Sequence, residues 1–200
     1  MTSNEWDEFA AEWDGNTATS AYADHAFAEL AQVVDLAGLR VFDFGCGTGL
    51  LAERLSPHVS KVVALDGSSK MIEQLKLKAL PNVFPIAGFL TASLMRRNTL
   101  LQTKFDLVTA SSVCAFLPDY GAILQTLRSL LRSGGTYVQW DWLASEESTE
   151  TGFTKRRVRR AMAAAGFINI ALTQPFTIEK FGDDTQVLME IGRASCRERV

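Results

Sequence analysis

The stretch VFDFGCGTG, residues 41–49, is the most informative part of this chain for its fold. An apolar run that ends in glycines and passes directly into a helical pattern predicts a buried strand, a tight turn and a helix. Glycine permits the turn and lets a ligand approach the backbone where a Cβ would clash. The next helix would present unpaired amides to that ligand. We therefore expect a binding site at the carboxyl end of this first strand, as in open α/β sheets.

Outward from this stretch, short apolar runs alternate with helical patterns. The predicted strands are 39–44, 61–66, 82–87, 105–110, 136–140, 167–173 and 185–191, and the predicted helices are 4–15, 22–36, 50–55, 69–77, 120–131 and 155–165. Such alternation predicts βαβ units and a mostly parallel sheet. No helix separates the last two strands, which should pair antiparallel. Pro85 in the third strand predicts a place at the sheet edge.

The composition is that of one globular domain without a general affinity for nucleic acid. Of 200 residues, 47% are hydrophobic and 22% charged, with a net charge of -3. The acidic N-terminus lacks a secretory signal, and no apolar run reaches the roughly eighteen residues of a membrane span. Cys46, Cys114 and Cys196 have neither metal-ligand nor disulfide spacing. We expect a cytoplasmic protein with reduced thiols and no metal site, either a monomer or a homodimer.

The single domain is expected to cover residues 1–192. Residues 193–200 continue no periodic pattern and are interpreted as a non-native or disordered tail. The basic run at 155–160 would spread around a helix, so we interpret it as a solvated helix face rather than an RNA site.

Two acids narrow the choice of ligand. A dinucleotide fingerprint would need glycine at position 50, where Leu50 stands, and a phosphate-binding loop of the Walker A type would need lysine there. Asp43 would repel a pyrophosphate but suits a cationic group. Asp66 closes the second strand, where a carboxylate can accept both hydroxyls of a ribose. This set fits a nucleoside that carries an amino-acid cation.

The motif at residues 43–49 resembles the first motif of class I S-adenosylmethionine-dependent methyltransferases. The run DGSSKM at 66–71 is similar to that family's Asp-x-Ser-x-x-Met signature, and the N-terminal segment around Trp6 and Trp13 resembles the lid of its small-molecule members. Further blocks lie at 105–108, 117–119 and 131–135. The resemblance covers roughly residues 5–192.

The resemblance implies an α/β, Rossmann-like sheet of seven mostly parallel strands in the order 3-2-1-4-5-7-6, with strand 7 antiparallel and helices on both faces. It implies S-adenosylmethionine as cofactor, S-adenosylhomocysteine as product, a small-molecule methyl acceptor, and a lid over residues 1–20. Asp66 would bind the ribose, Asp43 the amino group, and Met71 would flank the adenine. The remaining cofactor-binding residues would be Trp13, Gly45, Cys46, Gly47, Gly67, Gly88, Phe89 and Ser111.

One position departs from the family pattern. Where the family commonly has an acid that reaches the adenine amino group, Gly88 is followed by Phe89. Either Phe89 packs on the adenine or the affinity for the cofactor is weak. The missing acid keeps open the alternative of a regulatory protein that binds S-adenosylmethionine without catalysis. A second alternative, a NAD-dependent oxidoreductase, is opposed by the glycine spacing. For catalysis, His25 is the candidate proton acceptor or substrate-orienting group.

Overall fold

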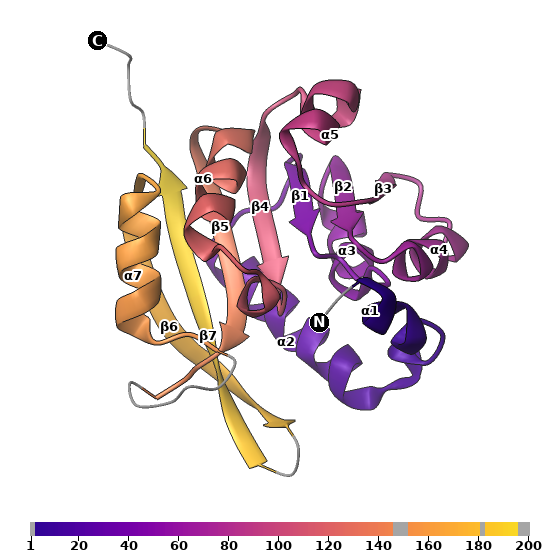
Figure 1. Cartoon of the computed structure of the whole chain (residues 1–200), viewed down its shortest axis with the longest axis horizontal. Helices are drawn as coiled ribbons and strands as arrows, with labels where there is room; N and C mark the ends of the chain where they lie inside the picture. The colour runs from indigo at the N-terminus through magenta and orange to yellow at the C-terminus, as the bar shows by residue number, and fades with distance from the viewer. Residues whose placement is uncertain (1–2, 146–151, 181–182, 196–200) are drawn as a thin grey trace. The chain divides into compact units, whose positions relative to one another are not determined.

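The computed structural model describes residues 3–145, 152–180 and 183–195. Its seven strands form one sheet in the order β3-β2-β1-β4-β5-β7-β6, which confirms the expected order. The chain divides into two compact units, residues 1–103 and 104–200, where the sequence predicts a single domain over 1–192 (Figure 1). None of the described helices is both long and apolar enough to cross a membrane.

The first unit is built on three parallel strands: β1 (Arg40–Phe44), β2 (Lys61–Asp66) and β3 (Val83–Ala87). The middle of β1 and β2 is buried throughout, as expected for short apolar strands of a parallel sheet. Phe44 pairs with Leu65, and Asp66 pairs with Ala87, so the three strands end close together. Strand β3 lies at the sheet edge, which confirms the prediction from Pro85.

Side-chain caps set the helix boundaries of this unit. The helices are α1 (Ser3–Phe9), η1 (Trp13–Gly15), α2 (Thr17–Val33), α3 (Leu50–Leu55), η2 (Ser56–His58), α4 (Ser69–Leu77), α5 (Ala92–Arg97) and η3 (Thr99–Leu101). The expected helix at 22–36 begins earlier, at Thr17, because the side chain of Asn16 accepts the amide of Ala18 as a cap. The helix expected over 4–15 is divided into α1 and η1 by a turn at residues 10–12.

Helix α5 is absent from the sequence prediction. Its six residues are too short for a clear helical period, and its beginning is marked only by Thr91, whose hydroxyl accepts the amide of Leu94. By contrast, α3, β2 and α4 have the predicted bounds. The side chain of Ser68 caps α4 by accepting the amide of Met71.

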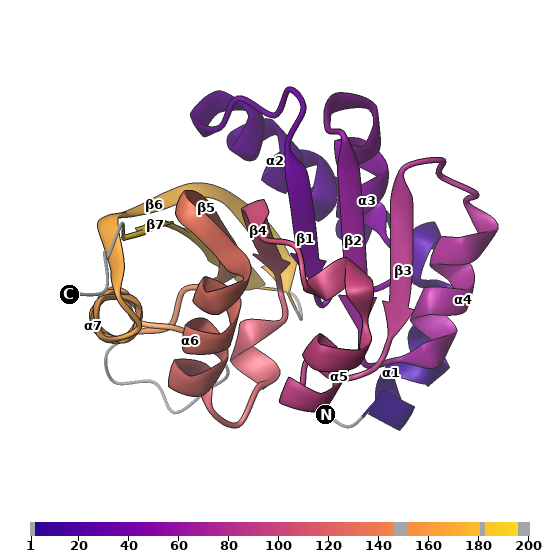
Figure 2. The ribbon, with the colours of Figure 1, turned by 90° about the horizontal axis from the view of Figure 1, so that it is seen from above.

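The second unit contains β4 (Phe105–Ser111), β5 (Leu131–Trp142), β6 (Phe167–Lys180) and β7 (Asp183–Ala194), with helices η4 (Cys114–Phe116), α6 (Tyr120–Leu130) and α7 (Lys155–Ala164). Strands β4 and β5 are parallel, whereas β7 pairs antiparallel with both β5 and β6, as predicted. Helices α6 and α7 lie side by side on one face of these strands (Figure 2). The β6–β7 hairpin is longer than predicted because ladder hydrogen bonds continue into its polar residues.

The expected boundary of a tail at Arg193 is corrected by the structure. Arg193 pairs with Thr136 of β5, and Ala194 pairs with Phe167 of β6 and is buried. The guanidinium of Arg128 donates a hydrogen bond of 2.6 Å to Ser195 Oγ. These three residues therefore belong to the packed unit. The rest of the predicted tail, with Cys196, lies outside the described residues.

Candidate functional site

The glycine loop at residues 45–49 joins β1 to α3 in a conformation that requires glycine. Gly45, Gly47 and Gly49 have φ values of 70°, 54° and 82°, in the left-handed region that other residues rarely adopt. The amides of Gly45 and Cys46 both donate to Leu65 O, at 2.8 and 3.1 Å, so the loop is bound to the end of β2. The loop thus stays at the carboxyl ends of the first two strands.

The room for a side chain differs between the glycines of this loop. A Cβ at Gly49 would lie 2.3 Å from Leu75 Cδ1 of α4, so close packing of loop and helix excludes any side chain there. A Cβ at Gly47 would meet only Trp13 Nε1 within 4 Å, at 3.9 Å. Gly47 therefore presents open backbone beneath the indole of Trp13, as a ligand-binding position requires.

Asp66 is the last residue of β2. Its carboxylate connects the glycine loop to a second loop, residues 67–68, which leads from β2 into α4. The amide of Gly47 donates to Oδ2 and the amide of Ser68 donates to Oδ1, both at 2.8 Å. Burial raises the pKa of this carboxyl and the amides lower it, while the nearby charge of Asp7 raises it further. Each carboxylate oxygen has a second lone pair. Asp66 can therefore order both loops and still accept hydrogen bonds from a ligand.

Asp43 and Cys46 lie on either side of the strand end. Asp43 is only 1% exposed, next to the last residue of β1. Burial raises the pKa of the Cys46 thiol well above its usual range, and the charges of Asp43 and Asp66 raise it further. Because only the thiolate is a strong nucleophile, Cys46 is a small neighbour in the loop rather than a reactive thiol.

The third loop follows β3 and brings Phe89 to Gly67. The amide of Gly88 donates to Asp66 O at 2.8 Å. The ring of Phe89 lies 2.8 Å from the position that a Cβ would take at Gly67, so the ring packs directly over this glycine. Phe89 is nevertheless 64% exposed, an unusual position for a large aromatic side chain. Met71 is 2% exposed and packs within the unit, and its contact with adenine stays a prediction.

The N-terminal segment, defined here as residues 3–16, contacts both loops. Asp14 accepts a hydrogen bond from Thr48 Oγ1 of the glycine loop and lies 2.8 Å from the ammonium of Lys78. Asp7 accepts hydrogen bonds from Ser68 Oγ and, at 3.3 Å, from the amide of Lys70. The sequence interpretation included Trp13 but missed Asp7 and Asp14. A sequence feature that could have pointed to Asp7 and Asp14 is that each directly follows a tryptophan.

Two predicted residues are not brought to these loops by any contact described above. His25 is exposed on α2, beside Asp24, whose carboxylate lies 2.6 Å from Arg54 of α3. Ser111 ends β4 in the second unit, where Ser112 follows with a φ of 53° and donates its amide to Trp140 O at 2.8 Å. The assigned roles of both His25 and Ser111 stay predictions.

The second unit contains a buried polar cluster that the sequence interpretation did not assemble. Tyr120 and Tyr137 donate their hydroxyls to Gln139 Oε1, at 3.0 and 2.6 Å, and Gln139 Nε2 donates to Asp141 Oδ2 at 3.0 Å. Glu190 of β7 lies opposite Gln139 and is fully buried. Burial and the charge of Asp141 raise the pKa of the Glu190 carboxyl well above its usual range. The sequence signal was polar residues at alternate positions of a strand that should be apolar.

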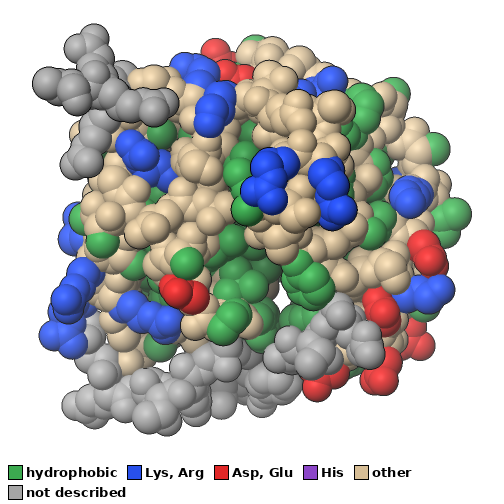
Figure 3. Space-filling model, turned by 45° about the horizontal axis from the view of Figure 1, so that its top comes forward, with side chains coloured by type: hydrophobic (Ala, Val, Ile, Leu, Met, Phe, Trp, Pro, Cys, Tyr) green, Lys and Arg blue, Asp and Glu red, His purple; other side chains and the backbone are tan. Residues whose placement is uncertain are grey.

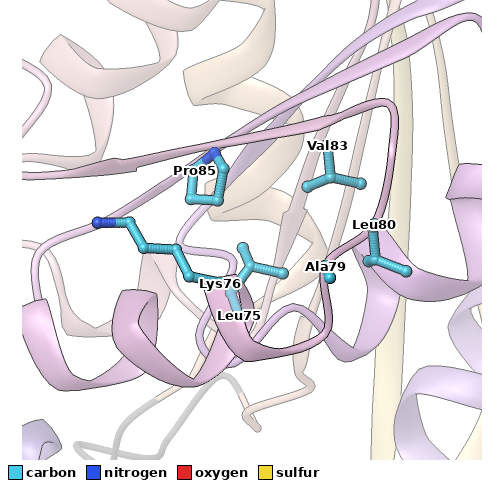
Figure 4. A pocket seen from close by; sticks show the side chains of 6 residues that line it. All are labelled: Leu75, Lys76, Ala79, Leu80, Val83 and Pro85. Carbon is cyan, nitrogen blue, oxygen red and sulfur yellow. The ribbon is translucent and has the colours of Figure 1, made fainter.

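An apolar pocket between α4 and the edge strand β3 is separate from the candidate site. Figure 4 shows its lining: Leu75, Lys76, Ala79, Leu80, Val83 and Pro85. None of the predicted cofactor-binding residues lines it. Within the described ranges, no group of three or more histidine, cysteine, aspartate or glutamate residues is arranged to bind a metal ion.

Comparison with known proteins finds methyltransferases among the proteins that this chain resembles. Residues 42–137 match the methyltransferase domain family. The ubiquinone biosynthesis O-methyltransferase of Xanthomonas euvesicatoria pv. vesicatoria is 31% identical over 102 residues, 51% of this chain and 42% of that protein. This chain therefore spans less than half the length of the curated relatives that it matches.

Two solved structures share the fold. The DhpI-SAM-HEP complex has a TM-score of 0.74 at 19% identity and covers 95% of this chain and 94% of that chain. The magnesium protoporphyrin IX methyltransferase of Synechocystis PCC 6803 with bound SAM has a TM-score of 0.64 at 20% identity, with coverages of 87% and 79%. The chain shares with these structures a Rossmann-like α/β fold. Over residues 42–137, the chain is similar to the methyltransferase domain family.

Proposed function

We propose that this chain transfers a methyl group from S-adenosylmethionine to an oxygen, nitrogen or carbon atom of a small molecule. The observation that carries the proposal is the carboxylate of Asp66, which binds the amides of Gly47 and Ser68 and retains lone pairs for the hydroxyls of a ribose. Curated relatives are named O-methyltransferases, and a solved neighbour was crystallised with SAM.

The residues present fit this cofactor better than a dinucleotide. The carboxylates of Asp7, Asp43 and Asp66 lie at or next to the two loops. Such a group of anions favours a cationic ligand and would repel a pyrophosphate. The open backbone at Gly47 and the exposed ring of Phe89 add a surface for the rest of a nucleoside. These features argue against the NAD-dependent alternative.

The proposed chemistry asks little of the protein beyond binding and alignment. The cofactor supplies a methyl group on a sulfonium, which is already an excellent leaving group. Asp66 would bind the ribose, Asp43 would attract the amino group, and Phe89 would pack on the adenine. Alignment of two reactants can lower a barrier by about 7–11 kcal/mol. His25 is retained as the proposed proton acceptor for an acceptor O–H or N–H group.

The proposal also includes a small-molecule acceptor rather than a nucleic acid, and a cytoplasmic location. On the face shown in Figure 3, lysine and arginine side chains lie in separate small groups rather than in one continuous patch. Binding of nucleic acid generally depends on a continuous basic surface. The net charge of -3 supports the same choice.

Calorimetric titration of the full chain with S-adenosylhomocysteine and with NAD tests the cofactor. We expect S-adenosylhomocysteine to bind and NAD not to bind. Asp66→Ala removes hydrogen bonds to a charged acceptor, each worth about 1.5–3 kcal/mol, and should weaken binding at least tenfold. The exposed Asp35→Ala is the matched control and should bind as the unmodified chain does. Unchanged affinity in Asp66→Ala would remove the ribose assignment.

Transfer of labelled methyl groups to a panel of phenols, amines and carbon acids then tests catalysis. Product formation on any of these acceptors supports the transferase. Tight binding of S-adenosylhomocysteine without transfer to any of them would favour the regulatory alternative instead.

A further inference from the structure

Two carboxylates in the first unit share one serine. The amide of Ser68 donates to Asp66 Oδ1 at 2.8 Å, while the hydroxyl of Ser68 donates to Asp7 Oδ1. Asp66 belongs to the end of β2 and Asp7 to helix α1 of the N-terminal segment. Their charges interact, since Asp7 contributes to the raised pKa of Asp66. Docking of the N-terminal segment therefore adds negative charge beside the acid that is proposed to bind the ribose.

The two acids of the N-terminal segment differ in how their charge is balanced. The carboxylate of Asp14 lies 2.8 Å from the ammonium of Lys78, which also lies 2.9 Å from Glu53. The hydrogen-bond partners of Asp7 among the described residues are the neutral hydroxyl of Ser68 and the neutral amide of Lys70. The ammonium of Lys70 makes its ion pair with Glu73, at 2.9 Å, and interacts with the charge of Asp7 only as a weaker, unpaired neighbour. Asp7 and Asp66 thus form a pair of acids without a cation in hydrogen-bond contact.

We propose that Asp7 makes closure of the N-terminal segment selective for the charge of the bound cofactor, so that the segment closes more tightly on the cationic donor than on the product. The inference rests on the proposed function. In that reaction the bond between methyl carbon and sulfur breaks, and sulfur keeps the electron pair. A lone pair of the acceptor forms the new bond. The sulfonium becomes a neutral thioether, and the cofactor loses one positive charge.

The loss of that charge removes an attraction that Asp7 contributes. Asp7 and Asp66 attract the sulfonium charge of the donor, and this part of the attraction is missing for the product, whose thioether is neutral and whose ammonium group is unchanged. Interactions of this kind persist over several ångströms in a partly buried site and weaken with salt. Asp7 would therefore help to retain the donor and to release the product. It would change the relative affinities for these two compounds and would not contact the reacting atoms.

Asp7→Asn tests the inference, with Glu8→Gln as the matched control because Glu8 is the next residue of α1 and is exposed. The probes are S-adenosylhomocysteine and sinefungin, in which an amine carries a positive charge in place of the sulfonium. Affinities are measured by calorimetry on the full chain at 50 and 300 mM salt. We expect Asp7→Asn to lower the ratio of sinefungin affinity to S-adenosylhomocysteine affinity by about three- to tenfold at low salt. High salt should shrink this effect, and Glu8→Gln should leave the ratio unchanged.

Hydrogen exchange provides a second measurement on the same variants. In the unmodified chain, amides of residues 5–16 should be protected more strongly by sinefungin than by S-adenosylhomocysteine, and Asp7→Asn should remove the difference. An equal loss of both affinities in Asp7→Asn, or no change in either, would overturn the inference and leave the proposed function intact. If neither compound binds the unmodified chain, the proposed function fails, and this inference fails with it.

Discussion

Single residues at the ends of β2 and β3 give the candidate site its chemistry. The glycines provide the backbone shape, but the side chains of Asp66 and Phe89 provide the groups that would distinguish one ligand from another. Phe89 stands where the family commonly has an acid, and its ring is exposed beside Gly67. An aromatic face can bind adenine by stacking, whereas the acid would bind its amino group by a hydrogen bond.

Replacement of the ring tests this interpretation. Stacking of a base on an aromatic side chain is worth about 1–3 kcal/mol, so Phe89→Ala should weaken S-adenosylhomocysteine binding by roughly five- to a hundredfold. Phe89→Asp, which restores the acid of the family pattern, should recover part of that loss. Leu77→Ala removes another exposed apolar side chain of the same unit and serves as the control in calorimetry. Unchanged affinity in Phe89→Ala would show that the ring only covers Gly67.

At the scale of elements, the turn from β1 into α3 depends on close packing against α4. Gly49 is the residue that caps α3, its φ is 82°, and the side chain of Leu75 fills the space that a Cβ would need. Helix α4 is in turn capped by Ser68, whose amide binds Asp66. The loops at the ends of β1 and β2 and the two helices that follow them are therefore ordered together.

Gly49→Ala should destabilise the protein for two reasons that add. A left-handed conformation costs a residue other than glycine about 1–2 kcal/mol, and forcing a methyl group into filled space costs about 1–3 kcal/mol. The free energy of unfolding in urea, followed by circular dichroism, should fall by about 2–5 kcal/mol. Gly15→Ala is the control, since no atom lies within 4 Å of its Cβ position. A similar midpoint for both variants would contradict the packing argument.

At the scale of the whole molecule, stability should depend on pH through the polar cluster of the second unit. Glu190 is fully buried, and in the described structure neither of its carboxyl oxygens has a hydrogen-bond partner. The titratable groups that act on it or share its cluster are Asp141, Tyr120, Tyr137 and Cys114. Because its pKa in the folded state is raised, Glu190 keeps its proton in the fold at a pH where the unfolded chain has lost it.

The sign of the pH dependence follows from this difference. The stability associated with the protonated Glu190 is fully present below the ordinary pKa of 4.5 and is lost as pH rises toward the raised value. Glu190→Gln cannot ionise, so its free energy of unfolding should exceed that of the unmodified chain by a margin that grows from pH 5 to pH 8. Asp184→Asn, at an exposed position of the same strand, should show no such trend. A constant difference between the Glu190→Gln and unmodified chains across this range would refute the argument.

Local patterns in the sequence were sufficient for most elements. Helices α3 and α4 and strand β2 have their predicted bounds, since apolar runs, glycines and caps act over a few neighbouring residues. The edge position of β3 could be predicted because proline lacks an amide hydrogen. The end of β7 could not, because Arg193 and Ala194 become strand residues only through pairing with Thr136 and Phe167.

The class of fold, the glycine loop and the acids Asp43 and Asp66 could all be predicted from sequence patterns. The structure was needed to show that Asp66 binds both Gly47 and Ser68, that Asp7 meets Ser68 across 61 positions of the chain, and that Glu190 lies opposite Gln139. Periodicity and turn chemistry are properties of neighbouring residues and can be seen in one stretch of sequence. Which distant side chains meet depends on sheet register and packing, which arise only when the whole unit has folded.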